Sequence, residues 1–253
     1  MKKINKSDII RDKISQSQTS PLKVYRELTV GNVGFLKFMY YEAVTSLLGP
    51  LPGGLGFFLR KKFYPALFKK VGRGLIIGRN VVIRHPNNIE LGDYVTIDDN
   101  CILDGRGAGE KGLVLEDQVI INRNCMLLAK TGYIVLGKRT SIGANSVIVS
   151  MSGVEVGEAV LTAGNCYLSA GVYQFDDLDT PVMDQTAYSK GPIMVGKNSW
   201  FGTGVTVLDG VKIGEGVVIG ASSMANKDIP DYAIAIGIPA KVFKMRTRKE
   251  VVT

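Results

Sequence analysis

The sequence predicts a mainly β protein: a parallel β-helix of triangular coils, with an α-helical appendage at residues 1–71 and a short basic tail at 246–253. Three observations lead to this prediction. A six-residue period runs through most of the chain from Ile77, Asn or Gly recurs at one place in that period, and an apolar segment ahead of it is interrupted by Gly and Pro. Because 45% of the residues are hydrophobic and the 30 glycines follow no Gly-X-Y repeat, a disordered chain and a collagen are excluded.

The first 73 residues carry a strong positive charge, with fourteen Lys or Arg against four Asp or Glu. Within them, residues 33–59 are apolar but are broken at 49–54, so they cannot form one membrane-spanning helix. We expect two shorter helices instead, at about 34–48 and 55–67. No nucleic-acid-binding motif accompanies the charge, so we expect no nucleic-acid partner.

Two interpretations of residues 33–70 stay open. Their basic and aromatic side chains are typical of a segment that lies on an anionic membrane surface. Alternatively, their apolar faces cap one end of the main domain and the lysines only face solvent. The N-terminus has no apolar stretch of the kind found in signal peptides, so we expect a cytoplasmic protein, with attachment at the inner face of the membrane under the first interpretation.

Sixteen six-residue units organise residues 72–245. The first position is Ile, Leu, Val or Phe in fifteen units, the fifth is Val, Cys, Ser or Thr in fifteen, and the fourth is Asn or Gly in ten. A large and a small inward side chain would fill a narrow core, whereas Asn and Gly suit corners where the backbone adopts positive φ. Three units then make one triangular coil of about 18 residues, and coils stack about 4.8 Å apart.

The few residues that commonly build metal or redox sites fit this pattern without such a role. Cys101, Cys125 and Cys166 all occupy the small fifth position, so we expect buried core thiols. With a single histidine and no paired cysteines, no metal is expected.

Two segments carry a resemblance to a known family. Residues 195–246, from VGKNSWFGTG to IPAKVFKMR, and residues 175–193, FDDLDTPVMDQTAYSKGPI, resemble the hexapeptide-repeat acyltransferases, in particular the sugar O-acetyltransferases of polysaccharide biosynthesis. The resemblance covers about 72–245 and implies a left-handed β-helix with a protruding loop near 175–193. It also implies a homotrimer, acetyl-CoA as acyl donor, and a sugar or glycan acceptor that meets the donor between subunits.

Carried over by position, the resemblance implies a set of cofactor-binding residues. Trp200 would flank the thioester, the small residues of two corners would line the pantetheine arm, and basic side chains would meet the nucleotide phosphates. The small residues are Gly202, Gly204, Gly220, Ala221 and Ser222, and the basic ones are Lys227 and Lys241 with Arg246 or Arg248. Corner geometry is the alternative explanation for the glycines, and a solvated charge is the alternative for the lysines.

The sequence departs from the family at the catalytic position. The family's general base is a histidine in a segment H-x-F-D-D, and Tyr173 stands in its place here. A phenol ordinarily titrates near pH 10, which makes it a poor base at neutral pH. The catalytic candidates are therefore Tyr173, Asp176 and Asp177. The only histidine, His85, is expected at the surface, on the same wall but four coils away, roughly 19 Å.

Three hypotheses follow from the missing histidine. Tyr173 or one of the two aspartates activates the acceptor hydroxyl, or positioning and an oxyanion contact alone support the reaction. In the third, the site is degenerate. The sequence thus predicts an acyl-CoA-dependent O-acyltransferase for a sugar hydroxyl in surface polysaccharide or lipid-linked glycan synthesis. The alternative is a catalytically degenerate trimeric β-helix that acts as a binding or scaffold protein.

Overall fold

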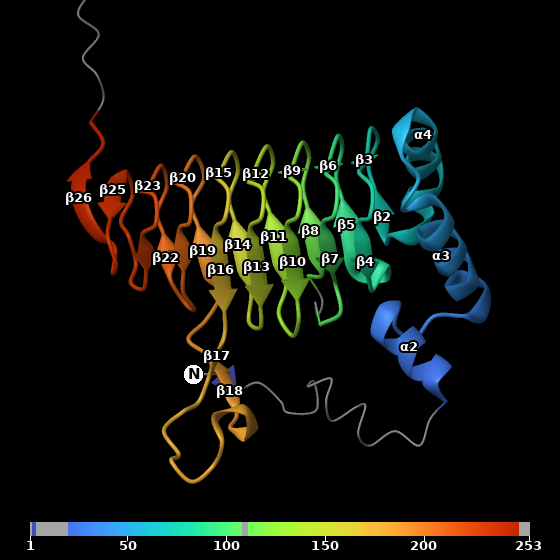
Figure 1. Cartoon of the computed structure of the whole chain (residues 1–253). Coiled ribbons are helices and arrows are strands. Elements are labelled where there is room, and N and C mark those ends of the chain that lie inside the picture. The colour runs from blue at the N-terminus through green and yellow to red at the C-terminus, as the bar shows by residue number, and fades with distance from the viewer. Residues whose placement is uncertain (1, 4–19, 108–110, 248–253) are drawn as a thin grey trace, which may run out of the picture.

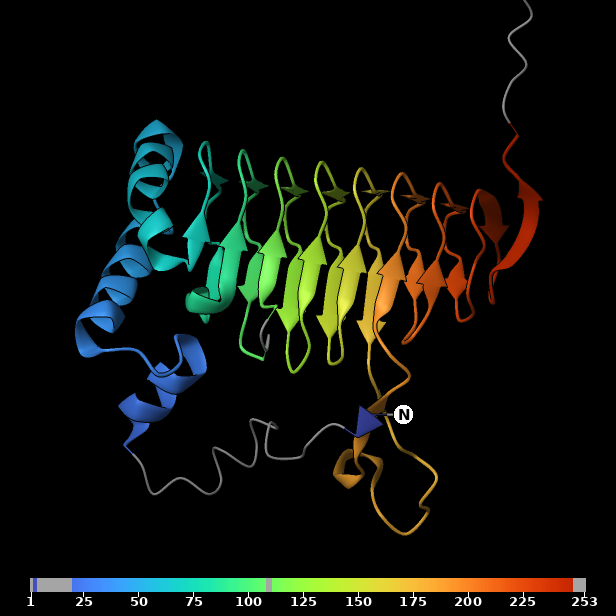
Figure 2. The ribbon, with the colours of Figure 1, turned by 180° about the vertical axis from the view of Figure 1, so that it is seen from behind.

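The computed structural model describes residues 2–3, 20–107 and 111–247. Three sheets form the walls of a long triangular β-helix, helices cover its N-terminal end, and one loop stands away from its side (Figure 1, Figure 2). The structure confirms the predicted fold class, a mainly β, left-handed parallel β-helix that follows an α-helical segment.

The three walls each stack strands from successive coils. The first contains β2 (Lys70–Val71), β5 (Ile89–Leu91), β8 (Leu113–Leu115), β11 (Ile134–Leu136), β14 (Val154–Val156), β19 (Ile193–Val195) and β22 (Lys212–Ile213). The second contains β3 (Ile76–Ile77), β6 (Thr96–Ile97), β9 (Ile120–Ile121), β12 (Ser141–Ile142), β15 (Leu161–Thr162), β20 (Trp200–Phe201), β23 (Val218–Ile219), β25 (Ala233–Ile236) and β26 (Lys241–Met245). The third contains β4 (Val82–Arg84), β7 (Ile102–Asp104), β10 (Met126–Ala129), β13 (Val147–Ser150), β16 (Tyr167–Ala170), β21 (Thr206–Val207) and β24 (Met224–Ala225). Neighbours are parallel except β26, which pairs antiparallel with β25.

The corners of the coils have the left-handed backbone that the repeat predicted. In the sixteen units, the fourth residue has positive φ in all but the one occupied by Pro86. This holds even where the residue is neither Asn nor Gly, as at Tyr94, Gln118 and Arg139. Stacking of the coils therefore imposes the conformation on residues that adopt it at some energetic cost.

The core is a single column of side chains from the first and fifth positions. Leu103, Ile121, Leu127 and Phe201 are fully buried in it. The three cysteines are free and buried in the same column, as predicted. At the N-terminal end of this column, the same hydrophobic core continues into the helical segment, so the helices and the β-helix form one packed unit.

Helices α3 (Phe35–Leu48) and α4 (Gly53–Phe63), with the short helix η2 (Tyr64–Leu67), close the N-terminal end of the β-helix. The structure confirms the two predicted helices and the break between them. Phe38, Tyr41 and Val44 are buried on one side of α3, and the Tyr41 hydroxyl donates to the carbonyl oxygen of Ile83 at 2.7 Å. The capping interpretation of the inner helix faces is therefore confirmed.

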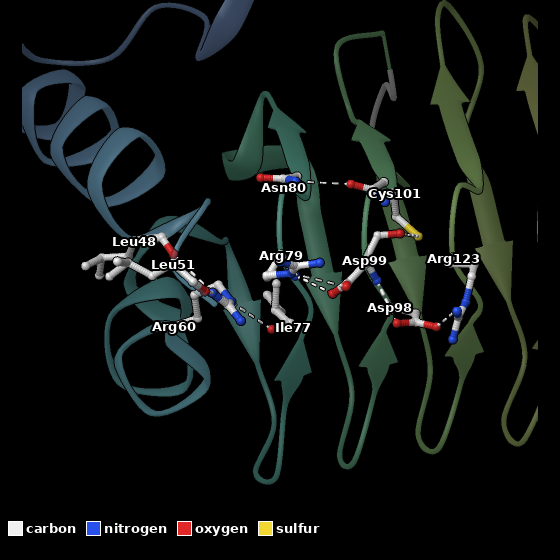
Figure 3. Close-up of polar contacts among 11 residues, drawn as sticks. Leu48, Leu51, Arg60, Ile77, Arg79, Asn80, Asp98, Asp99, Cys101 and Arg123 are labelled. Atoms are coloured by element: carbon white, nitrogen blue, oxygen red, sulfur yellow. Dashed lines mark hydrogen bonds and ion pairs between the residues drawn. The ribbon is translucent and has the colours of Figure 1, made fainter. Parts of the chain in front are cut away.

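Arg60 of α4 ties this cap together (Figure 3). Its side chain is 3% exposed and donates to the carbonyl oxygens of Leu51 at 2.7 Å, Ile77 at 3.0 Å and Leu48 at 3.1 Å. Burial lowers the pKa of the guanidinium, as the loss of hydration disfavours its charged form. One residue thus joins the end of α3, the connection to α4 and the first strand of the second wall.

A further helix, α2 (Pro21–Thr29), was not predicted from the sequence. Ser20 caps its N-terminus by accepting from the amide of Lys23. The end of α2 lies against His85, whose amide donates to the carbonyl oxygen of Thr29 at 2.7 Å. His85 is therefore half-buried rather than at the open surface, and burial lowers its pKa.

Within the described residues, no helix is both long and apolar enough to cross a membrane. The same part of the chain holds no group of three or more His, Cys, Asp or Glu side chains placed to bind a metal ion.

Candidate functional site

Tyr173 lies on the loop that leaves the β-helix after β16. The loop opens with β17 (Val172–Tyr173), passes the short helix η4 (Val182–Asp184) and returns through β18 (Ala187–Ser189), which pairs antiparallel with β17. It projects from the side of the molecule (Figure 1). The Tyr173 side chain is 46% exposed, so its phenol is open to a ligand or to another protein chain.

A network centred on Asp177 and Gln185 fixes the tip of this loop. The Asp177 carboxylate accepts from the amide of Asp179 at 3.0 Å and from the hydroxyl of Thr180 at 2.6 Å. These bonds lower the pKa of Asp177, because they stabilise its charged form. The Gln185 side chain is buried and donates to the carbonyl oxygens of Asp177 at 2.7 Å and Thr180 at 2.8 Å.

The two candidate aspartates therefore differ. The carboxylate of Asp177 is already bonded within a turn, which is a common role of Asp side chains in loops. Asp176 is exposed, and its carboxylate has no hydrogen bond to another described residue. Of the two, Asp176 has the carboxylate that is free to accept a proton from a substrate.

A buried aspartate that the sequence analysis did not single out anchors the base of the loop. Asp209, on the next coil, accepts from the Ser189 hydroxyl at 2.8 Å and from the amide of Lys190 at 2.6 Å. It is almost fully buried. An aspartate directly before the corner Gly210 was the available sequence signal, but its partners lie twenty residues away and only the fold brings them together.

A strand from the N-terminus extends the two-stranded sheet of the loop. Residues Lys2 and Lys3 form β1, whose backbone pairs antiparallel with Tyr188 and Ser189 of β18. The N-terminal residues thus reach the candidate catalytic loop, on the side of β18 away from β17 (Figure 2).

The predicted cofactor-binding residues gather on two consecutive coils near the C-terminal end. Gly202 and Gly204 precede β21, and Gly220, Ala221 and Ser222 precede β24. The Ser222 amide donates to the carbonyl oxygen of Thr203 at 2.8 Å, which stacks the two corners directly. Ala221 and Ser222 are exposed, so this corner offers a surface without bulky side chains.

The glycines of this corner are not equivalent. Gly202 is buried, and a Cβ there would lie 2.6 Å from the backbone nitrogen of Ala221, so close packing of the coils already requires glycine. At Gly204 the nearest atom to a Cβ would be 3.6 Å away, so glycine there is required only by its φ of 73°. Gly204 is thus the one whose open surface a ligand could use.

The remaining predicted cofactor residues surround the same end of the molecule. Trp200 lies on β20, half exposed on the outer face of the second wall and in register with Val218 of the next coil. Lys227 follows β24 in an exposed turn, and Lys241 begins the exposed strand β26. Arg246 donates to the carbonyl oxygen of Gly216, and Arg248 lies outside the described residues. Exposed Lys side chains and an open backbone corner fit a polyanionic donor such as acyl-CoA.

We call residues 202–204 and 220–222 the cofactor corner. Within one chain, the loop and the cofactor corner lie on opposite edges of the third wall. Gly204 and Ser222 lie where β21 and β24 begin, whereas Tyr173 follows the end of the parallel strand β16. A strand of four residues spans about 13 Å. In a single chain the two halves of the candidate site are therefore separated by at least the length of one strand.

His85 does not contribute to either half. It follows β4, and four strand steps in the third wall, through β7, β10 and β13, separate β4 from β16. This confirms the predicted four-coil separation from Tyr173, roughly 19 Å at the strand spacing.

Comparison with known proteins agrees with the repeat. The family model described as "Bacterial transferase hexapeptide (six repeats)" matches residues 192–226, and the model "Hexapeptide repeat of succinyl-transferase" matches residues 133–173. The two matches include Tyr173, Trp200 and the small residues 202–204 and 220–222, whereas residues 174–191 of the loop, Lys227 and Lys241 lie outside them.

Two curated relatives are transferases by name. A Mycobacterium tuberculosis protein named as a probable acetyltransferase is 38% identical over 118 residues, which is 47% of this chain and 39% of the relative. The dTDP-4-amino-4,6-dideoxy-D-glucose acyltransferase of Escherichia coli is 28% identical over 184 residues, covering 72% of this chain and 84% of that protein. The chain thus matches well under half the length of the first of these.

Among solved structures, a variant of the N-acyltransferase AntD from Bacillus cereus, in complex with dTDP and coenzyme A, has a TM-score of 0.55. It is 23% identical and covers 76% of this chain and 92% of its own, which shows a shared fold. Together with the family models, these findings confirm the predicted resemblance to the hexapeptide-repeat acyltransferases.

Proposed function

We propose that the protein is an acyl-CoA-dependent acyltransferase that acetylates a sugar hydroxyl in surface polysaccharide or lipid-linked glycan synthesis. The observation that carries the proposal is the presence of two half-sites on one sheet: an open small-residue corner at Gly204 and Ser222, and a braced, exposed loop at Tyr173. The named activities of the similar proteins, acetyl and acyl transfer with an amino sugar in one case, support the substrate class.

The donor would lie along the cofactor corner. Acetyl-CoA would supply the acetyl group as a thioester. Ala221 and Ser222 leave room beside the backbone for a narrow pantetheine chain, Lys227 and Lys241 would neutralise phosphate groups, and Trp200 would cover the thioester end. Each of these side chains or backbone positions is exposed in the single chain.

The acceptor would be held by the loop. The sugar oxygen attacks the thioester carbonyl, an ester C–O bond forms, and the C–S bond breaks to release a thiolate, which takes up the proton that the hydroxyl has lost. Asp176 is the group we assign to take the proton of the hydroxyl, because its carboxylate is otherwise unused. Tyr173 would orient the acceptor through a hydrogen bond to its phenol. Much of the rate would then come from positioning rather than from a strong base.

A homotrimer would join the two half-sites across an interface between copies. Rows of apolar side chains run along the outer faces of the second and third walls, where a single chain leaves them exposed to water. They include Ile76, Ile120 and Leu161 on the second wall and Val82, Met126 and Tyr167 on the third. Such rows are typical of surfaces buried between subunits.

A second candidate is transfer to an amino sugar. The loop has no histidine near it, and a neutral amine is itself nucleophilic, so it depends less on a general base than a hydroxyl does. The Escherichia coli relative, named for a dTDP-linked amino sugar, also favours this candidate.

The test is release of free thiol from acetyl-CoA by purified protein, with a panel of hydroxyl-bearing sugars, dTDP-linked amino sugars and no acceptor. We expect release that depends on the acceptor, falls about tenfold or more in Tyr173→Phe and Asp176→Asn, and is unchanged in Tyr94→Phe, a tyrosine at a distant corner. Release only with amino sugars would favour the second candidate. Acetyl-CoA binding by calorimetry without release would contradict both and support the degenerate β-helix.

A further inference from the structure

The outer sides of α3 and α4 form an exposed apolar face. On α3, Phe38, Tyr41 and Val44 point into the core, and the opposite side carries Leu36 and Leu47, with Leu36 84% exposed. On α4, Gly56 and Arg60 face inward, whereas Leu55 and Phe58 face outward, with Phe58 73% exposed. We name Leu36, Met39, Leu47, Leu55 and Phe58 the cap face. Its side chains are large, and neither the β-helix nor α2 covers them.

The two charged residues of α3 do not interrupt this face. Lys37 donates to the side chain of Asn87 at the start of the β-helix, and Glu42 accepts from the hydroxyl of Tyr25 on α2 at 3.0 Å. Both charges are thus directed toward the body of the protein. α3 is apolar on both of its sides, which is unusual for a helix at the surface of a water-soluble domain.

Positive charge lies beside the apolar residues. Lys61 and Lys62 follow Phe58 on the outer side of α4, and Lys70 lies just beyond η2; all three are exposed and make no ion pair with another described residue. From Ala43 to Ile89 the sequence has eight Lys or Arg and no Asp or Glu. The cap face therefore combines large apolar side chains with basic ones, and the acidic side chain of α3, Glu42, is bonded to Tyr25 of α2.

We propose that the cap face binds an anionic lipid bilayer, with α3 and α4 lying in the membrane–water interface. Apolar side chains on one side of such a helix enter the boundary of the acyl chains, and flanking lysines attract acidic headgroups. A second copy of the chain is a poor occupant, because a symmetric contact would place Lys61 and Lys62 of both copies together. The proposal goes beyond the proposed transfer reaction and does not depend on it.

The test is co-sedimentation of the full-length protein with sucrose-loaded vesicles of phosphatidylcholine alone or with 30% phosphatidylglycerol. We expect binding to the anionic vesicles that weakens as salt rises. Lys61→Ser with Lys62→Ser should reduce the affinity roughly thirtyfold, from the attraction of two basic residues to an acidic surface. Leu55→Ser with Phe58→Ser should reduce it at least tenfold, because both side chains would leave the lipid.

Matched control variants distinguish specific binding by the cap face from non-specific binding of the protein to vesicles. Lys130→Ser with Lys212→Ser removes the same charge from exposed sites on the β-helix, and Leu178→Ser with Val182→Ser removes exposed apolar side chains from the loop. Both controls should bind vesicles like the native protein, and circular dichroism should show every variant folded. Equal loss in the controls, no binding by the native protein at low salt, or no preference for anionic vesicles would each overturn the proposal. The proposal would also be overturned if the native protein did not bind vesicles and Leu55→Ser with Phe58→Ser changed the oligomer size. That result would show that the face is a protein–protein contact.

Discussion

At the residue scale, Gln185 decides whether the loop presents Tyr173 and Asp176 in one arrangement. Its amide bridges two carbonyl oxygens across the loop, at Asp177 and Thr180. Gln185→Leu removes both bonds but keeps a similar volume. We expect acyl transfer to fall by about tenfold to a hundredfold through misplacement of the loop. The thermal midpoint should hardly change, since the loop projects from the β-helix. Val182→Ala, at the exposed tip, is the control and should keep native activity; a Gln185→Leu protein of native activity would show that the loop needs no brace.

His85 makes a second prediction at this scale, on the pH dependence of stability. Burial lowers its pKa in the folded protein below the ordinary histidine value of about 6.5, with Asp104 opposing the shift and Arg106 adding to it. The unfolded chain therefore binds the proton more readily, so the contribution of neutral His85 to stability is complete above about pH 6.5 and is lost as the pH falls toward the folded pKa. His85→Gln should flatten the fall of the unfolding free energy from pH 7 to pH 5.5, measured by urea denaturation. An unchanged slope would mean that His85 is equally hydrated in both states.

At the scale of elements, the helical cap depends on one buried cation. Arg60 donates to the last carbonyl oxygen of α3, to one in the connection to α4 and to one of β3, and no other side chain in the described structure bonds to these three groups. Arg60→Met keeps the length of the side chain but leaves the carbonyl oxygens without donors. We expect a loss of about 2–4 kcal/mol of unfolding free energy, measured by guanidinium denaturation. Lys61→Met, one residue away and exposed, should change stability by less than about 0.5 kcal/mol; equal effects would show that the three bonds contribute nothing specific.

The elements also show what the sequence could predict. The wall strands, the corners and the core cysteines follow from a local period of six, because each coil repeats the same inward and outward pattern. The helices near 34–48 and 55–67 follow from an apolar run broken by Gly and Pro. Helix α2 has no such pattern: none of its own residues is buried, and its position depends on contacts with His85 and Glu42.

The site was only partly accessible to the same reasoning. The stacking of residues 202–204 on residues 220–222 could be predicted, because the two groups are close in sequence and lie on adjacent coils; their role in cofactor binding stays a prediction. The roles of Gln185, Asp209 and Arg60 could not be predicted, since the groups that each of them bonds to are brought near only by the fold. The distinction between Asp176 and Asp177 likewise requires knowing which carboxylate is already bonded.

At the scale of the whole molecule, the division of the site between two edges of one wall predicts complementation between copies. Tyr173→Ala removes one half-site and Ala221→Trp blocks the other. We expect each variant alone to lose most of its activity. If the protein forms the proposed homotrimer, co-expression of the two variants should restore about a quarter of native activity, the fraction of sites that combine two intact halves in a random mixture. Mixtures of separately purified trimers that do not exchange subunits are the control. No recovery after co-expression would place the whole site within one chain.

The regular stacking of coils has a further consequence for a molecule seated on a bilayer by its cap. The helices lie at the N-terminal end of the β-helix. The loop bearing Tyr173 leaves the third wall after β16, four strands beyond β4. Each coil adds about 4.8 Å along the axis. The number of coils between the cap and the loop therefore sets the distance from the lipid surface to the proposed acceptor site. Insertion or deletion of one complete coil between β7 and β13 would move that height by one fixed step and leave every contact within the loop unchanged.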